Sequence, residues 1–198
     1  IDVTFLVETW TDAESVCLRR LRAEGFTVID RSRPRDRDDT LATNHGGVAV
    51  IAMPGIRLSS LNLGAKPTTF ELLSVRITCG SSSCIASVIY RPGSERVTSA
   101  FFDDISDVLD RLVTFSDPVF LVGDVNVRLD RPTDASACEF TEVLAAHGFS
   151  NHVTSATHDL GGALDVVVTR ADLSPPLVEI VDPGLSDHRL LEWSSTFA

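Results

Sequence analysis

Short apolar runs bounded by turn residues make up most of the chain. Runs rich in valine, isoleucine and phenylalanine, closed by glycine, proline or polar clusters, predict β-strands. They lie at Val3–Val7, Val48–Ala52, Phe70–Thr78, Ile85–Tyr90, Val119–Val122, Asn151–Thr154, Leu164–Thr169, Leu177–Val181 and Arg189–Ser194. Many short strands with few helices favour stacked sheets, so the pattern predicts an α/β (α+β) sandwich of two mostly antiparallel sheets with helices outside.

Three segments instead repeat their apolar residues at helical spacing. The first is expected to begin with a capping box formed by Thr11 and Glu14 and to end at Gly25. Each helix would cover one face of a sheet with its apolar stripe. The apolar positions of the other two are Phe101, Ile105, Val108, Leu109 and Leu112 and, ahead of Gly148, Phe140, Val143 and Leu144.

One domain accounts for the whole chain. Its 198 residues, 43% of them hydrophobic, supply a sizeable core without cross-links. No repeat or low-complexity tract marks a boundary, so the domain is expected to cover residues 1–198. Because an apolar run starts almost at once at Val3, we expect the chain to be a fragment of a longer polypeptide.

The acidic composition bears on the choice of partner. The net charge of −11 argues against a protein whose affinity comes mainly from neutralising many phosphates. A metal site built from carboxylates would supply part of that charge, and a bound cation would locally invert its effect. The charged stretch at residues 30–39 is predicted to be a solvated loop; the alternative is a contact with a charged partner through Arg31, Arg33, Arg35 and Arg37.

The cysteines, Cys17, Cys79, Cys84 and Cys138, lack the spacing of a zinc site. Cys79 and Cys84 could face each other across a hairpin, but free thiols in a reducing compartment are favoured, which predicts an intracellular protein. No apolar window is long enough for a membrane span and no signal-peptide pattern is present. No membrane partner is therefore expected.

Polar groups at the ends of strands are the candidate chemistry. The apolar strand from Val119 runs into Asp124 and Asn126, whose side chains alternation places on the same side. A carboxylate and an amide there can hold a water and a phosphate oxygen together. Glu8 and Tyr90 also close buried-looking strands. Taken singly, each of these residues can equally be explained as a polar turn or a packing residue.

Asp165 lies inside an otherwise hydrophobic strand, where an unpaired carboxylate would cost on the order of several kcal/mol or become protonated. It therefore needs a cation, a metal or a histidine as a partner. Asp187 and His188 stand between Gly184 and an apolar strand, and alone they would be read as a surface turn. One shared site explains all of these groups more simply than several coincidences.

Together these segments resemble the endonuclease/exonuclease/phosphatase superfamily. Their order and approximate spacing match across nearly the whole chain. Within the superfamily, Thr157-His158 ahead of Leu164-Asp165 is similar to the apurinic-type endonuclease domain of metazoan non-LTR (LINE-like) retrotransposon polyproteins. The matching segments are Glu8-Thr9-Trp10, Gly46-Gly47-Val48-Ala49-Val50, Tyr90-Arg91-Pro92, Gly123-Asp124-Val125-Asn126, Leu164-Asp165 and Ser186-Asp187-His188.

The resemblance implies a four-layer DNase I-like sandwich and a role for each matched position. Glu8 would bind Mg²⁺, for which Mn²⁺ could substitute, and Asp187 would join the metal directly or through water. Asp124 would orient or deprotonate the attacking water, and Asn126 would hold a phosphate oxygen. His188, polarised by Asp165, would stabilise charge on the phosphate or transfer a proton.

Other positions are less directly implied. Tyr90 would hydrogen-bond the scissile phosphate or the leaving oxygen. His152, Thr157 and His158 are candidates for substrate contact, although structural roles are open for both histidines. His45 and His147 are interpreted as structural. Members of the family have a further strand before the one that carries the glutamate, ending in an asparagine, and we expect this strand to be missing here.

The resemblance also implies a function. A metal-dependent phosphodiesterase of this branch nicks one strand of double-stranded DNA, so that the exposed 3′-hydroxyl primes reverse transcription by a downstream reverse transcriptase domain. Such a protein acts in the nucleus. Two alternatives remain open: a phosphatase or phosphodiesterase for a small or lipid phosphate, which suits the negative charge better, and a catalytically decayed binding module of the same fold.

Overall fold

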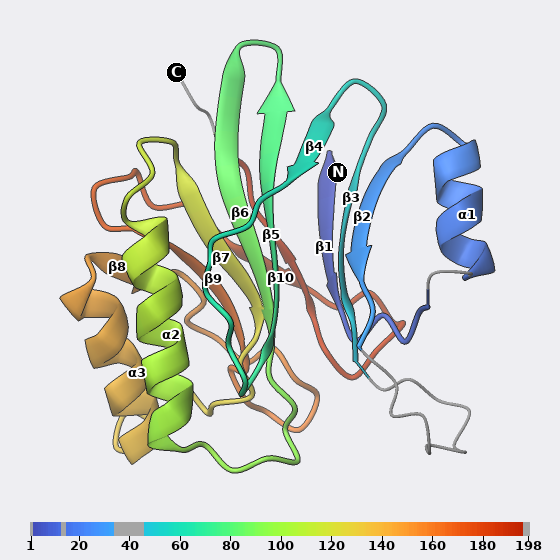
Figure 1. Cartoon of the computed structure of the whole chain (residues 1–198). Helices are drawn as coiled ribbons and strands as arrows, with labels where there is room; N and C mark the ends of the chain where they lie inside the picture. The colour runs from blue at the N-terminus through green and yellow to red at the C-terminus, as the bar shows by residue number, and fades with distance from the viewer. Residues whose placement is uncertain (1, 13–14, 34–45, 196–198) are drawn as a thin grey trace.

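The computed structural model describes residues 2–12, 15–33 and 46–195. Within these ranges, strands outnumber helices, and they alternate along the chain. Figure 1 shows the sheets between helices α2 and α3 on one side and helix α1 on the other. The elements are β1 (Val3–Val7), α1 (Val16–Ala23), β2 (Thr27–Arg31), β3 (Val48–Ala52), β4 (Arg57–Ser60), β5 (Glu71–Cys79), β6 (Ser82–Tyr90), α2 (Ser99–Leu112), β7 (Val119–Asp124), α3 (Ala135–Ala146), β8 (Phe149–Asn151), β9 (Asp165–Arg170), β10 (Glu179–Val181) and β11 (Leu190–Glu192).

The larger sheet has the strand order β4-β5-β6-β7-β9-β8. Only the central pair, β6 and β7, is parallel, and helix α2 makes the crossover that a parallel connection requires. All other neighbours in this sheet are antiparallel. The parallel register aligns Tyr90 with Asp124, and the antiparallel register of β7 and β9 aligns Asp124 with Asp165. Three strand ends with polar residues therefore meet at one edge.

The second layer consists of the antiparallel sheet β1-β3-β2 and the antiparallel pair β10-β11. Both pack on the larger sheet, because Phe5 of β1 and Phe120 of β7 both lie against Trp193, which follows β11. The two mostly antiparallel sheets with flanking helices confirm the predicted four-layer sandwich. This is the DNase I-like arrangement.

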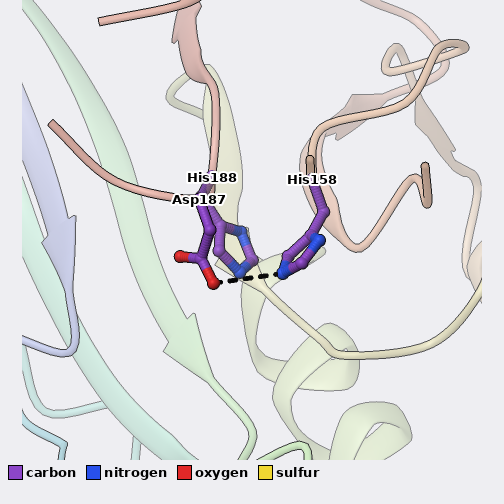
Figure 2. Close-up of side chains that lie close together, drawn as sticks. All are labelled: His158, Asp187 and His188. Atoms are coloured by element: carbon purple, nitrogen blue, oxygen red, sulfur yellow. Dashed lines mark ion pairs between the residues drawn. The ribbon is translucent and has the colours of Figure 1, made fainter. Parts of the chain in front are cut away.

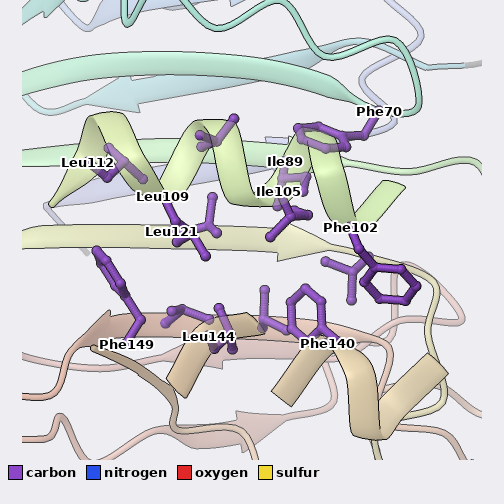
Figure 3. Close-up of a cluster of buried hydrophobic side chains, with 14 of the residues drawn as sticks. Phe70, Ile89, Phe102, Ile105, Leu109, Leu112, Leu121, Phe140, Leu144 and Phe149 are labelled. Carbon is purple, nitrogen blue, oxygen red and sulfur yellow. The ribbon is translucent and has the colours of Figure 1, made fainter. Parts of the chain in front are cut away.

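Side-chain alternation along the larger sheet produces two separate cores. Residues of one parity, such as Ile89 and Leu121, pack against α2 and α3, as Figure 3 shows. Residues of the other parity, such as Val88 and Val122, pack against the β1-β3-β2 sheet and the β10-β11 pair. A strand buried on both faces is apolar throughout, which is why Val119–Val122 reads as a continuous hydrophobic run.

Most predicted elements are confirmed, with ends shifted by a few residues. The exceptions are β2 and β4, which the sequence pattern did not predict, and β8, which is Phe149–Asn151 instead of 151–154. β4 has a single buried residue, Leu58, among exposed neighbours. Such edge strands are defined by pairing with a neighbour more than by their own composition.

The predicted capping box at the first helix is wrong. The helix begins at Val16 with Ser15 as its N-cap residue, and the Thr11 hydroxyl instead lies 3.0 Å from that of Thr9. Glu14 and His45 fall outside the described residues, as do Arg35 and Arg37. The described part of the 30–39 stretch is not wholly solvated, since Arg31 donates to the carbonyl of Leu72.

All four cysteines are free thiols, as predicted. Cys79 is paired in register with Ser82, and Cys84 with Ile77, so the two cysteines do not face each other across the hairpin. None of the helices in the described ranges has the length and apolarity needed to cross a lipid bilayer.

Candidate active site

The centre of the site is a pair of carboxylates on adjacent strands. Asp124 ends β7 and Asp165 begins β9. Both residues are buried, with 2% and 8% of their surface exposed. Burial strongly disfavours two neighbouring negative charges, so a positive group must lie close by. The structure brings Asp124, Asp165 and His188 together, as the sequence predicted.

His188 supplies that positive group. Its Nδ1 donates a hydrogen bond of 2.9 Å to Asp165 Oδ2, and its Nε2 lies 4.0 Å from Asp124 Oδ2. The hydrogen bond to Asp165 raises the pKa of His188 to about 9, against the opposing effect of partial burial, and the charges of Asp165, Asp124 and Asp187 reinforce the rise. The imidazole is therefore protonated near neutral pH, with its Nε2–H directed into the site.

Asp124 is suited to accept a proton. Burial raises the pKa of Asp124 well above its usual range, and the charge of Asp165 raises it further, while the positive His188 lowers it. A carboxylate whose pKa is raised towards neutrality is a stronger base than an exposed one. This geometry and basicity fit the extraction of a proton from a water molecule.

Asn126 orients Asp124. Its main-chain N–H donates to Asp124 Oδ1 over 2.8 Å, and its side-chain amide donates to Asp124 Oδ2 over 2.7 Å. The same amide also donates to the carbonyl of Arg91 over 2.9 Å, so both of its hydrogens are engaged. Asn126 could hold a phosphate oxygen, the role expected from the sequence, only by giving up one of these bonds.

Gly123 is required by the close approach of β7 to β6. Its φ is +129°, and a Cβ atom placed on it would lie 2.1 Å from the carbonyl oxygen of Ile89. Only glycine fits this combination of backbone angle and contact. The glycine of the Gly-Asp-x-Asn segment therefore sets the position from which Asp124 enters the site.

Glu8 and Tyr90 are hydrogen-bonded to each other next to Asp124, with which Tyr90 is paired in register. The Tyr90 hydroxyl donates a short hydrogen bond to Glu8 Oε1, and the Trp10 indole N–H lies 3.3 Å from Glu8 Oε2. Burial raises the pKa of Tyr90, and the bond to Glu8 raises it further, so the phenol stays protonated. Glu8 and Trp10 have φ values of +49° and +50°, and both are exposed. Left-handed backbone at non-glycine residues is typical of functional sites.

Asp187 lies beside His158 (Figure 2). His158 Nδ1 accepts the main-chain N–H of Leu160 over 3.0 Å, so in neutral His158 the proton is on Nε2. That Nε2 lies 3.3 Å from Asp187 Oδ2, and the His158 ring packs edge-on against His188 with centroids 4.8 Å apart. His158 thus contacts the site residues themselves.

Two of the candidates for substrate contact do not face this cluster. Thr157 is fully buried, and its hydroxyl accepts the main-chain N–H groups of Leu164 and Asp165. It anchors the start of β9 and offers no surface to a substrate. The His152 ring lies against the Thr169 hydroxyl, four residues along β9 from Asp165. These positions correct the expectation that Thr157 and His152 contact the substrate.

The donor atoms of the site residues fit a hard divalent cation. Carboxylate oxygens predominate, which suits Mg²⁺ or Mn²⁺. Glu8 belongs to neither of the two groups of close donor atoms found among the described residues. His158 Nε2, which carries a proton when neutral, is a poor metal donor. The groups are Asp124, Asp165 and His188, and His158, Asp187 and His188.

Arg91 belongs to the Tyr90-Arg91-Pro92 segment, and the sequence pattern did not predict a role for it. The structure places its buried guanidinium on the main-chain carbonyls of Val125 and Asn126, directly behind Asp124. The signal was present in the sequence as an arginine that directly follows a strand end. These two acceptors lie more than thirty residues away, and only the fold reveals them.

The fold and this cluster define a class of phosphoester-cleaving enzymes. The sequence profile of the Endonuclease/Exonuclease/phosphatase family matches residues 1–188, and the chain belongs to that family. Members of the family are hydrolases that act on phosphoester bonds. No curated protein sequence matches the chain.

Solved structures with the same fold act on different substrates. The endonuclease domain of TRAS1, a telomere-specific non-LTR retrotransposon, superposes with a TM-score of 0.64 at 11% identity, covering 94% of this chain and 95% of that one. A 3′ phosphatase, NExo, from Neisseria, bound to a product DNA hairpin, gives 0.66 at 14% identity and 99% and 89% coverage. The mannosyl-6-phosphatase Bt3783 of Bacteroides thetaiotaomicron gives 0.63 at 13% identity and 99% and 85% coverage.

Proposed function

We propose that this chain is a Mg²⁺-dependent endonuclease that nicks one strand of double-stranded DNA. The observation that carries the proposal is the convergence of Asp124, Asp165 and His188, in which a basic carboxylate and a protonated imidazole face one space. A base for water and a positive donor for phosphate are the two groups that in-line hydrolysis of a phosphodiester needs.

In this mechanism Asp124 accepts a proton from the attacking water, held in orientation by Asn126. His188 donates its Nε2–H to a phosphate oxygen and offsets the charge that accumulates there, while Asp165 keeps the ring oriented and protonated. Tyr90 orients Glu8 through its hydroxyl, and it would donate to the phosphate or the leaving oxygen only by releasing Glu8.

Glu8 and Asp187 would hold the cation, Asp187 directly or through water. When bound, Mg²⁺ supplies Lewis-acid polarisation of the phosphate and neutralises charge at the leaving oxygen. Mn²⁺ has the same preference for oxygen donors and should substitute. Hydrogen bonds from Tyr90 and Trp10 to the two carboxylate oxygens of Glu8 hold this side chain in the orientation in which it would bind the cation.

Duplex DNA is favoured as the substrate by two features. Nucleic acids are bound or cut by two of the similar structures, the TRAS1 domain and NExo. In addition, Trp10 presents a 52% exposed indole next to Glu8, where an aromatic surface can contact a base or sugar beside the scissile phosphate. The Thr157-His158 segment ahead of Asp165 supports a retrotransposon role, with a reverse transcriptase domain downstream and action in the nucleus.

A phosphatase for a sugar or lipid phosphate is the second candidate. It is favoured by the net charge of −11 and by the similarity to the mannosyl-6-phosphatase. The two are separated by assaying supercoiled plasmid, mannose 6-phosphate and a phosphoinositide at equal protein concentration. Conversion of plasmid to open circle in Mg²⁺, abolished by EDTA, supports the endonuclease. Phosphate release without nicking supports the phosphatase.

The third candidate, a decayed binding module, predicts DNA binding without any turnover. Nicking must therefore be compared with binding of the same plasmid in the same buffer.

A further inference from the structure

The segment Tyr90–Gly93 and the turn Asp124–Asn126 are joined by contacts that centre on Arg91. The Arg91 main-chain N–H donates to the carbonyl of Asp124 over 2.9 Å, and its own carbonyl accepts from the Asn126 amide. A Cβ atom on Gly93 would lie 2.8 Å from Asn126 Oδ1, so the two segments are in close contact there as well.

The guanidinium extends this connection. Its Nε donates to the Val125 carbonyl over 2.7 Å, and one terminal nitrogen donates to the Asn126 carbonyl over 2.7 Å. The other terminal nitrogen donates to the carbonyls of Pro92 and Glu95 over 3.2 and 2.8 Å. The face of the guanidinium covers the Phe101 ring of α2 at 5.6 Å. Arg91 is only 3% exposed.

From this arrangement we propose that Arg91 is the positioning residue that holds Asp124 and Asn126 in their productive geometry. The proposal rests on the proposed function, because it assigns the base role to Asp124. Arg91 does not touch substrate; its contribution passes through the main chain of residues 124–126.

Asn126 needs such support because its φ is +50°. Left-handed backbone is strained for a non-glycine residue and persists only where the surroundings fix it. Arg91 fixes the peptide carbonyls on both sides of the Asn126 N–H, which itself donates to Asp124. Without these bonds the turn can relax, and Asn126 would no longer orient the carboxylate.

Lysine cannot replace arginine here. The acceptors lie in two segments, and the planar guanidinium reaches Val125 and Asn126 in one and Pro92 and Glu95 in the other with separate N–H groups in a fixed fork. A single ammonium could serve one segment and would leave buried carbonyls of the other without a donor, which destabilises their arrangement. Arg91→Lys therefore keeps the charge and removes the geometry.

The test compares Arg91→Lys with Arg76→Lys. Arg76 is a matched control, since it is a partly buried arginine of the same sheet that pairs with Asp117, away from the site. If Arg91 positions Asp124, Arg91→Lys lowers kcat for plasmid nicking by about 10²-fold, as misplaced groups of this kind do, while KM changes little. Arg76→Lys keeps wild-type kcat. Equal loss in the two variants, or wild-type kcat in Arg91→Lys, overturns the proposal.

A second readout does not depend on activity. The two Asn126 side-chain amide protons are hydrogen-bonded in the structure, so their NMR shifts should be dispersed in wild type and move towards free-amide values in Arg91→Lys. Unchanged shifts would refute positioning, even if the protein proves to cleave another phosphoester. Should the variant fail to fold, hydrogen exchange of the wild-type Arg91 Nε–H decides: exchange as fast as that of Arg76 would contradict the proposal.

Discussion

At the scale of single residues, the site is a set of charges that control one another. Asp165 keeps His188 protonated, and the charge of Asp165 makes Asp124 harder to ionise. In such a cluster each apparent pKa belongs to the coupled groups together and not to one residue. A substitution at one member should therefore be visible in the titration of another, and this gives tests that separate a catalytic from a packing role.

Asp165→Asn should slow nicking at least tens of times with nearly unchanged DNA binding. The change keeps the shape but removes the charge that raises the pKa of His188, and loss of one preorganised electrostatic contact costs roughly 10²–10³ in turnover. Single-turnover rates and equilibrium binding measure the two effects. A variant with wild-type rate and pH profile would make Asp165 a structural carboxylate with another partner.

The sign of the pH effect follows from the raised pKa of His188. The pair with Asp165 stabilises the folded state fully below about pH 6.5, the ordinary pKa of histidine, and this contribution is lost as the pH rises through about 9. In Asp165→Asn the pKa of His188 should fall towards its ordinary value. The pH above which stability and activity decline should therefore be lower than in wild type. NMR titration of the His188 ring in metal-free protein checks the shift directly.

Asp124→Ala should abolish nicking and leave the fold intact. Because burial raises the pKa of Asp124 in the folded protein, ionisation of this carboxyl costs folding free energy as the pH rises above its ordinary pKa, and removing it relieves that cost. Asp124→Asn is the matched control, because it retains an acceptor for the Asn126 amide. We expect both variants to melt within a few degrees of wild type and neither to nick; nicking by either would assign the water to another base.

At the scale of elements, the site depends on how strand ends are brought together. β6 and β7 run in parallel with Gly123 directly against the Ile89 carbonyl, and β9 returns antiparallel to place Asp165 beside Asp124. Helices α2 and α3 cover the far face of these strands through one apolar core. The catalytic groups thus stand on rigid strands and on turns tied to them.

Gly123→Ala should destabilise the protein by roughly 3 kcal/mol or more, because the added methyl group collides with the main chain of β6. Gly148→Ala is the control: φ is also positive, at +74°, but no atom lies within 4 Å of the new Cβ. The control should lose only about 1–2 kcal/mol. Chemical denaturation measures both, and equal losses would show that backbone angle alone sets the requirement at Gly123.

At the scale of the whole molecule, the charge distribution limits how DNA can be held. Seven of the 17 basic residues pair with carboxylates within the ranges that the structure describes, and the chain carries 28 acidic residues. With a net charge of −11, the field of the whole molecule disfavours phosphates, and a bound cation must offset the acidic site. The ion pairs of the basic residues are Arg22–Asp30, Arg33–Glu71, Arg76–Asp117, Arg111–Asp107, Arg128–Asp130, Arg170–Asp172, Arg189–Asp159 and Arg189–Asp182.

DNA affinity should therefore depend only weakly on salt. The slope of log K against log salt is about −0.9 per phosphate neutralised, so we expect a slope shallower than about −3. The measurement is duplex binding by the inactive Asp124→Asn variant across a range of KCl concentrations at fixed Mg²⁺. A slope of about −6 or steeper would indicate a broad basic surface that the described residues do not display.

The sequence by itself determined the strands that are buried on both faces, the helices of high amphipathicity and the polar residues at strand ends. Val119–Asp124 is an example, since its apolar run and terminal carboxylate are local properties of the chain. The need of Asp165 for a positive partner could also be derived locally, because the cost of burying a lone charge depends only on its surroundings.

Which partner each group meets was decided by tertiary structure. His188 lies 23 residues from Asp165, and the carbonyls bound by Arg91 lie 34 and 35 residues away. Edge strands such as β4 exist because a neighbour pairs with them, and the first helix begins after Ser15, four residues beyond Thr11. Periodicity records which face of an element is buried, whereas strand register and close packing decide which distant atoms come into hydrogen-bonding range.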